Sequence, residues 1–419
     1  MLSSYFKVIL TLQTVYFDHY PFLYKPPLEI LSVKNGSGIR LSKVRQRFDL
    51  PLSLFPAFLF SAAIFLFVFS LLDRIPRVPN PRGDPRICAW TLLSIICFCG
   101  LVFYTLWFLV HRSEFIAVFN EGFRHESELR TDYNSTKKIK PRSTTEKGLF
   151  YIAKMTIWAF YIFTPIGTIF ITYLNFDPLL PFFEFILSMF PTLRKILLLF
   201  ALNSETLFTF GMFVTRVVSV TVFAYEAMRI ILFGISIVLV WGNVIISLLT
   251  SISSLVDRFW RKIILQGFRR HLKFYKVLMI IFHSLDEATA TLALLAATIG
   301  ISGCMFIAVR LHSVNESYFT GFNLFVSVNS VIWAKIILDM LGNLCMVSVK
   351  VLRHFGTIGI LRRMGRHENK LYLREVKYLK FLSIPVGLGT ARFSSMTQEV
   401  KSKILMFMIE QVSNLLMTF

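Results

Sequence analysis

The sequence predicts an all-α protein that crosses a lipid bilayer seven times, with a cytoplasmic N-terminus and an extracellular C-terminus. Three observations lead to this fold class. The 419 residues are 55% hydrophobic and only 16% charged, whereas a soluble domain is about 45–50% apolar and about 25% charged. Seven stretches approach the length of about 20 apolar residues that a spanning helix requires. Basic residues gather on alternate connections between these stretches.

The expected spans form a polytopic helix bundle and run, in chain order, over Leu52–Leu72, Cys88–Val110, Leu149–Asn175, Arg229–Leu249, Ala288–Val309, Thr320–Val349 and Ile404–Phe419. A further apolar run, Leu207–Tyr225, is also long enough to span, but Arg216 stands at its middle. Only three residues separate this run from the fourth span, which leaves little room for a reversal. We expect it to be an approach helix that continues into the fourth span, and a count of eight spans is the alternative.

The positive-inside rule sets the orientation of the bundle. Of the 45 Lys and Arg residues, 34 lie on connections that fall on the N-terminal side of the membrane. These are a cytoplasmic N-terminal segment (1–51), two basic inner loops (111–148 and 251–285) within the region of the first six spans (52–349), and a basic cytoplasmic segment before the last helix (350–403). The last helix (404–419) then ends outside. The plasma membrane is the expected location.

Several function classes find no support in the sequence. The net charge of +21 follows from the inner-face basic residues and comes without any nucleic-acid-binding motif. The five cysteines lie in or beside apolar runs without metal-ligand spacing. A phosphate-cradling loop and a nucleophile elbow are also missing, so we expect no enzyme, cofactor or metal. The sequon at Asn315, on an expected external loop, is either a glycosylation site or a chance tripeptide.

The last span carries the most informative polar pattern. Gln411, Asn414 and Thr418 share one helical face, and Glu410 lies beside it. Because polar groups are costly against lipid, this face should meet either a water-filled path or another helix. The stripe therefore predicts a pore lining, in which Glu410 attracts cations, or else hydrogen bonds between helices.

The sixth span contains two charged residues, Lys335 and Asp339, four positions apart. This spacing places them on one helical face within reach of an ion pair. An intramembrane pair is either a proton or substrate relay in a secondary transporter, or a mutually neutralising structural pair.

Several aromatic and amide side chains are expected at a similar depth in the membrane. They predict a pocket for small, mostly uncharged ligands. The candidates are Phe322, Asn323, Phe325 and Asn329 in the sixth span, and Trp90, Tyr173 and Tyr225 in other helices. Each aromatic residue taken alone could equally be a lipid-facing anchor or part of the core. Glu226 and Arg229 lie nearby at a spacing that allows them to pair.

Four segments resemble the arthropod chemoreceptor superfamily, the insect-type gustatory and odorant receptors, and especially its springtail members. They are Phe115–Asn120 leading to Glu128–Arg130, the Pro-rich turn Asp177–Phe183, the helical extension Phe268–Tyr275, and the approach Ser383–Phe393 with Thr397. The Thr-Tyr-(apolar)-Gln-Phe signature of gustatory receptors is missing, because Val412 follows Gln411. The gustatory and odorant branches both stay open.

The resemblance implies a chemosensory receptor that is a ligand-gated, non-selective cation channel for tastants or odorants. In that superfamily four subunits, identical or related, each give their last helix to a central pore, and each holds a small-molecule pocket in the outer half of its bundle. The alternative is a secondary transporter that uses Lys335 and Asp339. Neither function involves nucleic acid.

Overall fold

The computed structural model describes residues 9–18, 26–32, 39–44, 49–78, 84–134, 144–262, 265–312, 317–356, 366–388 and 391–418. Within these ranges, six helices are long and apolar enough to cross a membrane: Pro51–Arg77, Arg86–Val110, Lys154–Tyr173, Glu205–Ser253, Asp286–Ile307 and Ser327–Phe355. They correspond to the first six expected spans. The chain is therefore a multi-pass membrane protein built around a helix bundle.

The first half of the chain contributes β1 (Leu28–Ser32), β2 (Ile39–Lys43), α2 (Asp49–Arg74), the short turn η2 (Ile75–Arg77), α3 (Pro85–Tyr104), the π-helical η3 (Thr105–Val110) and α4 (Arg112–Asn134). A π-helical turn, η1 (Thr14–Asp18), precedes them. Helix α3 begins where Asp84 caps it by accepting a hydrogen bond from the backbone N–H of Arg86. Pro85 follows at the first helical position, which suits its missing N–H.

The middle of the chain consists of α5 (Thr144–Tyr173), α6 (Leu179–Met189), α7 (Pro191–Phe200) and α8 (Glu205–Lys262). Helix α8 is a single element of 58 residues, about 87 Å long at 1.5 Å per residue. The apolar run 207–225 therefore continues into the fourth span as expected, and the chain does not reverse between them. This continuity excludes the alternative of eight spans.

The second half consists of α9 (Leu265–His283), α10 (Asp286–His312), α11 (Ser317–Phe355), α13 (Arg366–Tyr378), β3 (Pro385–Leu388), β4 (Ala391–Ser395) and α14 (Gln398–Thr418). Helix α14 begins at Gln398 rather than at the expected Ile404, and it is not among the six apolar spans. The reason is its charge, because Lys401, Lys403 and Glu410 interrupt its apolar character.

Two antiparallel hairpins, β1–β2 and β3–β4, were not foreseen from the sequence. The first docks on α4 through Asn120, which pairs with both backbone groups of Leu41. The Leu41 N–H donates to Asn120 Oδ1 at 2.9 Å, and Asn120 Nδ2 donates to the Leu41 carbonyl at 2.9 Å. One amide side chain thus completes the hydrogen bonding of a strand residue that is fully buried.

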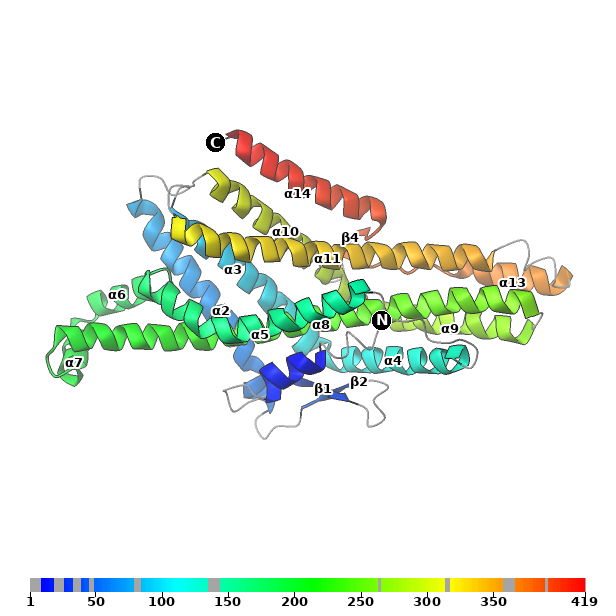
Figure 1. Ribbon diagram of the computed structural model, residues 1–419, viewed down its shortest axis with the longest axis horizontal. Coiled ribbons are helices and arrows are strands. Elements are labelled where there is room, and N and C mark those ends of the chain that lie inside the picture. The colour runs from blue at the N-terminus through cyan, green and yellow to red at the C-terminus, as the bar shows by residue number, and fades with distance from the viewer. Residues whose placement is uncertain are drawn as a thin grey trace.

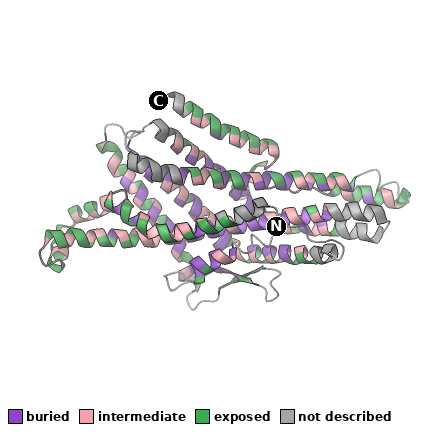
Figure 2. Ribbon diagram, viewed as in Figure 1, coloured by how far each residue is buried: buried purple, intermediate pink, exposed green. Residues whose placement is uncertain are grey.

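Helices α5, α8 and α11 run along the length of the molecule, and α2 and α3 cross them obliquely (Figure 1). The ends of α4, α9 and α13 gather at one end of the molecule, and α6 and α7 lie at the other. Buried residues concentrate where α3, α8, α10 and α11 meet, whereas α6, α7 and much of α14 are exposed (Figure 2). The expected basic inner loops 111–148 and 251–285 contain α4 and α9, and the basic segment 350–403 contains α13. The structure brings the ends of these three helices together at one end of the molecule.

Candidate functional site

An apolar cavity of about 190 Å³ lies inside the bundle. Five helices line it: Ile96, Cys99, Gly100 and Phe103 from α3, Phe160 from α5, seven residues between Met228 and Val238 from α8, Leu292, Leu295, Ala296 and Ile299 from α10, and Asn329, Ser330, Trp333, Ala334 and Ile337 from α11. No side chain with a formal charge is among them. The cavity therefore suits an uncharged, largely apolar molecule.

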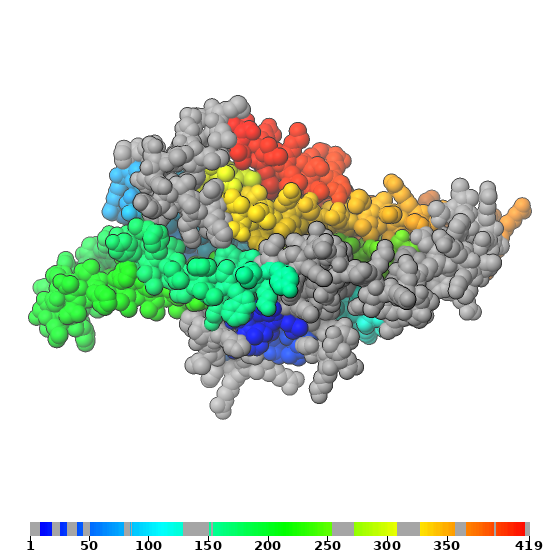
Figure 3. Space-filling model, viewed as in Figure 1, coloured from blue at the N-terminus to red at the C-terminus, as the bar shows by residue number. Residues whose placement is uncertain are grey.

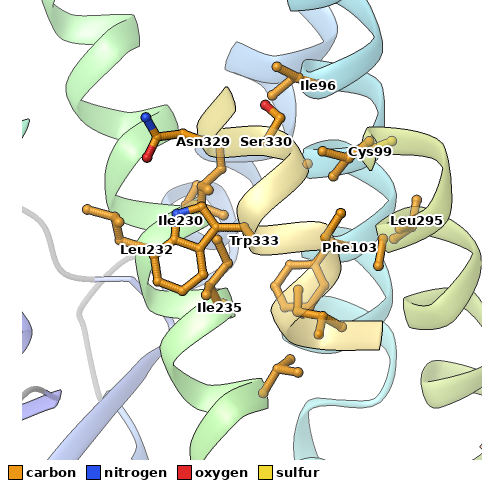
Figure 4. Close-up of a pocket in the computed structure, with 18 of the residues that line it drawn as sticks. Ile96, Cys99, Phe103, Ile230, Leu232, Ile235, Leu295, Asn329, Ser330 and Trp333 are labelled. Atoms are coloured by element: carbon orange, nitrogen blue, oxygen red, sulfur yellow. The ribbon is translucent and has the colours of Figure 1, made fainter. Parts of the chain in front are cut away.

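The few polar groups of the lining lie on α11. Figure 4 shows Asn329 and Ser330 at one end of the cavity wall, with the rings of Trp333 and Phe103 further along it. Asn329 carries an amide and Ser330 a hydroxyl, and Trp333 adds one donor, its indole N–H. A ligand with one hydroxyl or carbonyl group would match this division into a polar end and an apolar body.

The shape of the cavity depends on a close contact between α3 and α8. A Cβ atom added at Gly234 would lie 2.4 Å from the ring carbon Cε1 of Phe103. Only a glycine allows the ring to lie this close to the α8 backbone, which brings Phe103 into the wall of the cavity.

A buried ion pair lies on α8 beside the cavity. Arg229 and Glu226 pair at 2.6 Å with both side chains almost completely buried. The pairing expected from their spacing is therefore confirmed. Because the two charges neutralise each other, they leave the neighbouring lining residues, Met228 and Ile230, in an uncharged environment.

A second buried charge network fixes the end of the bundle at which α6 and α7 lie. Arg216, the residue that interrupts the apolar run on α8, donates from Nε to Asp177 Oδ1 at 3.1 Å and pairs through Nη2 with Oδ2 of the same carboxylate. It also donates to the side chain of Asn175 at 2.9 Å and to the carbonyl of Thr172 at 3.2 Å. Arg216 thereby fastens α8 to the turn between α5 and α6.

The residues proposed from the sequence as ligand contacts are dispersed. Asn329 lines the cavity. Trp90 is buried elsewhere and donates from Nε1 to the carbonyl of Phe176 at 2.6 Å. Tyr173 is exposed at the end of α5, and Tyr225 donates its hydroxyl hydrogen to the carbonyl of Tyr161 at 3.0 Å. Phe322, Asn323 and Phe325 belong to the first turns of α11, with side chains outside the described part, and Asn315 lies outside the described residues.

The expected pair of Lys335 and Asp339 is corrected by the structure. Asp339 instead accepts from Lys401 of α14, with 3.0 Å between Oδ1 and Nζ, and Lys335 is exposed. The spacing along α11 allowed the pair, but a lysine on the facing helix is the partner that Asp339 meets. One turn further along α11, Asn343 Oδ1 accepts from Gln398 Nε2 at 3.3 Å.

The polar stripe of the last helix is only partly turned away from the bundle. Glu410 and Asn414 are exposed, whereas Gln411 is half-buried. Thr418 ends α14, and its side chain is outside the described part. Large apolar residues are exposed on the same helix, with Met406 at 72% and Ile409 at 67% of their full exposure. In Figure 3, α14 forms a ridge at the edge of the molecule.

No protein-family model and no curated protein sequence matches the chain. Several solved structures match it in three dimensions, among them two structures of one receptor. One is the insect olfactory receptor OR5 from Machilis hrabei, with a TM-score of 0.57, 10% identity, and coverage of 99% of this chain and 97% of that chain. The other is the same receptor in complex with eugenol, with a TM-score of 0.55, 11% identity, and coverage of 99% and 98%. The chain has the fold of an insect olfactory receptor. The fold implied by the sequence resemblance is therefore confirmed.

Sequence reasoning missed most of the cavity wall, including Phe103, Gly234 and Trp333. These residues lie on three helices, and nothing in their local spacing marks them as neighbours. The sequence offered one signal, which concerns Trp333 alone. Trp333 follows the predicted ligand contact Asn329 by four positions and therefore shares its helical face.

Proposed function

We propose that the chain is a chemosensory receptor of the plasma membrane that acts as a ligand-gated, non-selective cation channel. The observation that carries the proposal is the apolar cavity inside the bundle, whose only side-chain amide and hydroxyl are those of Asn329 and Ser330 on α11. A solved receptor with the same fold carries eugenol, a small molecule with an aromatic ring. In this proposal the cavity holds an odorant-like molecule rather than a sugar, because a wall without charged groups offers a polyhydroxylated ligand too few partners. On its sequence motifs, we place the chain nearest the springtail members of the superfamily.

Helix α14 is the proposed pore helix, with Glu410, Gln411, Asn414 and Thr418 as its candidate lining. A single copy of this helix cannot enclose a path, so the proposal requires an assembly, a homo- or hetero-tetramer with related subunits. The exposed face of α14 supports it: polar Glu410 and Asn414 and apolar Met406 and Ile409 all lie uncovered by the rest of this chain. A helix with both kinds of exposed residue suits a place between water on one side and neighbouring helices on the other.

The proposed orientation has the N-terminus in the cytoplasm and the end of α14 outside. It is supported by the gathering of α4, α9 and α13, which come from three of the basic inner segments, at one end of the bundle (Figure 1). The sequon at Asn315 then belongs to the outer side.

The test is a whole-cell recording from cells that express the chain and receive eugenol, small volatile alcohols and ketones, and sucrose. We expect the apolar compounds to evoke a cation current, and Glu410→Ala or Gln411→Ala to change its ion selectivity. Ser402→Ala, an exposed position on the same helix, should leave the selectivity unchanged and serves as the control. Asn329→Leu should raise the concentration for half-maximal response by removing the polar end of the cavity.

The transporter alternative makes the opposite prediction. A relay that uses Asp339 would give proton-coupled uptake without a channel current, and Asp339→Asn would abolish the uptake. That result would replace the channel proposal. The contact of Asp339 with Lys401 favours the channel, because it ties this carboxylate to the proposed pore helix instead of to Lys335.

A further inference from the structure

Helix α14 packs on the bundle through Met408 and through the partly buried side chains of Val400, Ile404 and Leu405. Among the α14 residues whose side chains the structure describes, 398–414, Met408 alone is buried, at 4% exposure. It enters a hole between α10 and α11. A Cβ atom added at Gly300 would lie 2.2 Å from Met408 Cε and 2.9 Å from Ala334 Cβ. Three helices therefore meet at Met408 with no space for one further methyl group.

The opposite side of this contact is the wall of the cavity. Ala334 lines the cavity on α11, and Ile299, the residue before Gly300, lines it on α10. Met408 thus lies directly behind the wall without being part of the lining. Because packed interiors deform little, a displacement of the wall at these two helices must move the side chain that fills the hole between them.

The start of α14 has a different kind of attachment. Lys401 pairs with Asp339, and Gln398 donates to Asn343, so two polar contacts join α14 to α11 near its first turns. The close approach at Gly342, where a Cβ would lie 3.2 Å from Lys401 Cδ, belongs to the same contact. We call these four residues, Asp339, Asn343, Gln398 and Lys401, the polar clamp. Beyond Met408, residues 409–414 are exposed or half-buried.

We infer that Met408 is the positioning residue through which an occupant of the cavity moves α14. An occupant shifts the wall formed by α10 and α11, Met408 follows the wall, and α14 turns about the polar clamp. The exposed residues that follow Met408, among them the candidate pore residues Glu410 and Asn414, move furthest. They lie further from the polar clamp, about which α14 turns, than Met408 does. This inference rests on the proposed function, since it supplies the link between the cavity and the pore helix.

The experiment fills the cavity with a tethered probe, so that it does not depend on the natural ligand. Ser330→Cys places a thiol in the lining, and benzyl methanethiosulfonate attaches a benzyl group there. Because Cys99 is itself part of the lining, every chain in this experiment also carries Cys99→Ala. Mass spectrometry measures the extent of attachment, and the treated chain without Ser330→Cys controls for the other native cysteines. The attachment is repeated with Met408→Ala and with Met408→Leu in the Ser330→Cys chain. Two readouts follow: hydrogen exchange of the amides in 398–418, and the cation current.

With Met or Leu at position 408, attachment should change both the hydrogen exchange of α14 and the current, the latter by about five-fold or more, the lower bound of a typical coupling between sites. With Ala at position 408, the same extent of attachment should change neither. Leucine retains enough volume to fill the hole, whereas alanine leaves it empty. Gly300→Ala, which pushes Met408 out of the hole, should weaken both responses as well.

Two results would overturn the inference. One is an equal change in α14 exchange with Ala and with Met at position 408, because another contact would then carry the motion. The other is an unchanged α14 in every variant despite complete attachment. If the exchange of α14 follows the expected pattern but no variant shows a current, the channel proposal fails while the role of Met408 stands.

Discussion

Removing Arg216 should destabilise the chain far more than removing an exposed charged residue at the α6–α7 end of the bundle. The Arg216 side chain is 7% exposed and that of Asp177 is fully buried. Arg216→Met would leave the Asp177 carboxylate in place with only one contact from the network, the backbone N–H of Leu180 at 3.2 Å. An uncompensated buried charge of this kind costs about 3–5 kcal/mol of unfolding free energy.

The same reasoning predicts the behaviour of the double variant. Replacing both partners, as in Arg216→Met with Asp177→Asn, removes the unpaired charge and should restore much of the loss, because a buried pair contributes little net stability relative to neutral residues. Arg194→Met is the matched control. Arg194 pairs with Glu205 at 3.3 Å, but both side chains are more than half exposed, so its loss should cost less than about 1 kcal/mol.

The assay is reversible unfolding of the purified protein in mixed detergent, followed by circular dichroism. An Arg216→Met variant whose unfolding free energy stays within about 1 kcal/mol of wild type would refute the reasoning, because the buried carboxylate would then be stable without its partner. A double variant less stable than Arg216→Met alone would refute it as well.

Two further predictions concern the hairpin β1–β2 and helix α9. Asn120→Ala leaves both backbone groups of Leu41 without their partners and should cost about 1–3 kcal/mol per buried group, seen as faster hydrogen exchange in 39–44; unchanged exchange there would contradict the role of Asn120. Burial raises the pKa of Tyr275, on α9, to about 12 from an ordinary value of 10.0, and the neutral hydroxyl meets the Ser348 hydroxyl at 2.8 Å and the Lys380 carbonyl at 3.0 Å. The folded state therefore holds the hydroxyl proton of Tyr275 more tightly than the unfolded state does. The stability that this proton contributes is fully present below pH 10, and the free energy of unfolding falls by up to about 1.4 kcal/mol per pH unit as the pH rises toward 12. Tyr275→Phe should remove that part of the pH dependence in an unfolding titration, and an identical pH profile in both proteins would contradict it.

The sequence predicted the features that depend on local patterns. Apolar length and charge placement located the six apolar spans, and the tight spacing before Arg229 correctly indicated that α8 does not reverse. The pairing of Glu226 with Arg229 followed from helical spacing alone. These properties are set within one helix, where neighbours in sequence are neighbours in space.

The features that the sequence did not predict depend on contacts between distant segments. Asp339 has a possible partner four residues away, yet its partner is Lys401 on another helix. Arg216 is separated from Asp177 by 39 positions, and the cavity draws its wall from five helices. The hairpin β1–β2 depends on Asn120, 79 positions after Leu41. The periodicity of a helix or strand relates only residues that are close in sequence. Contacts between distant segments are therefore seen only in the three-dimensional structure.

The most direct test of the central claim is a current recording from purified protein in planar bilayers, with and without a blocked cavity. Ala296→Phe places a ring in the cavity from α10, where Ala296 is buried in the lining. Met305→Phe, at an exposed position on the same helix, is the matched control. We expect eugenol or a volatile alcohol to evoke a cation current in the wild type and in Met305→Phe, and to evoke none in Ala296→Phe. An equal current in Ala296→Phe would show that the cavity is not the ligand site, and a wild-type protein that binds these compounds in the cavity without passing current would contradict the channel function.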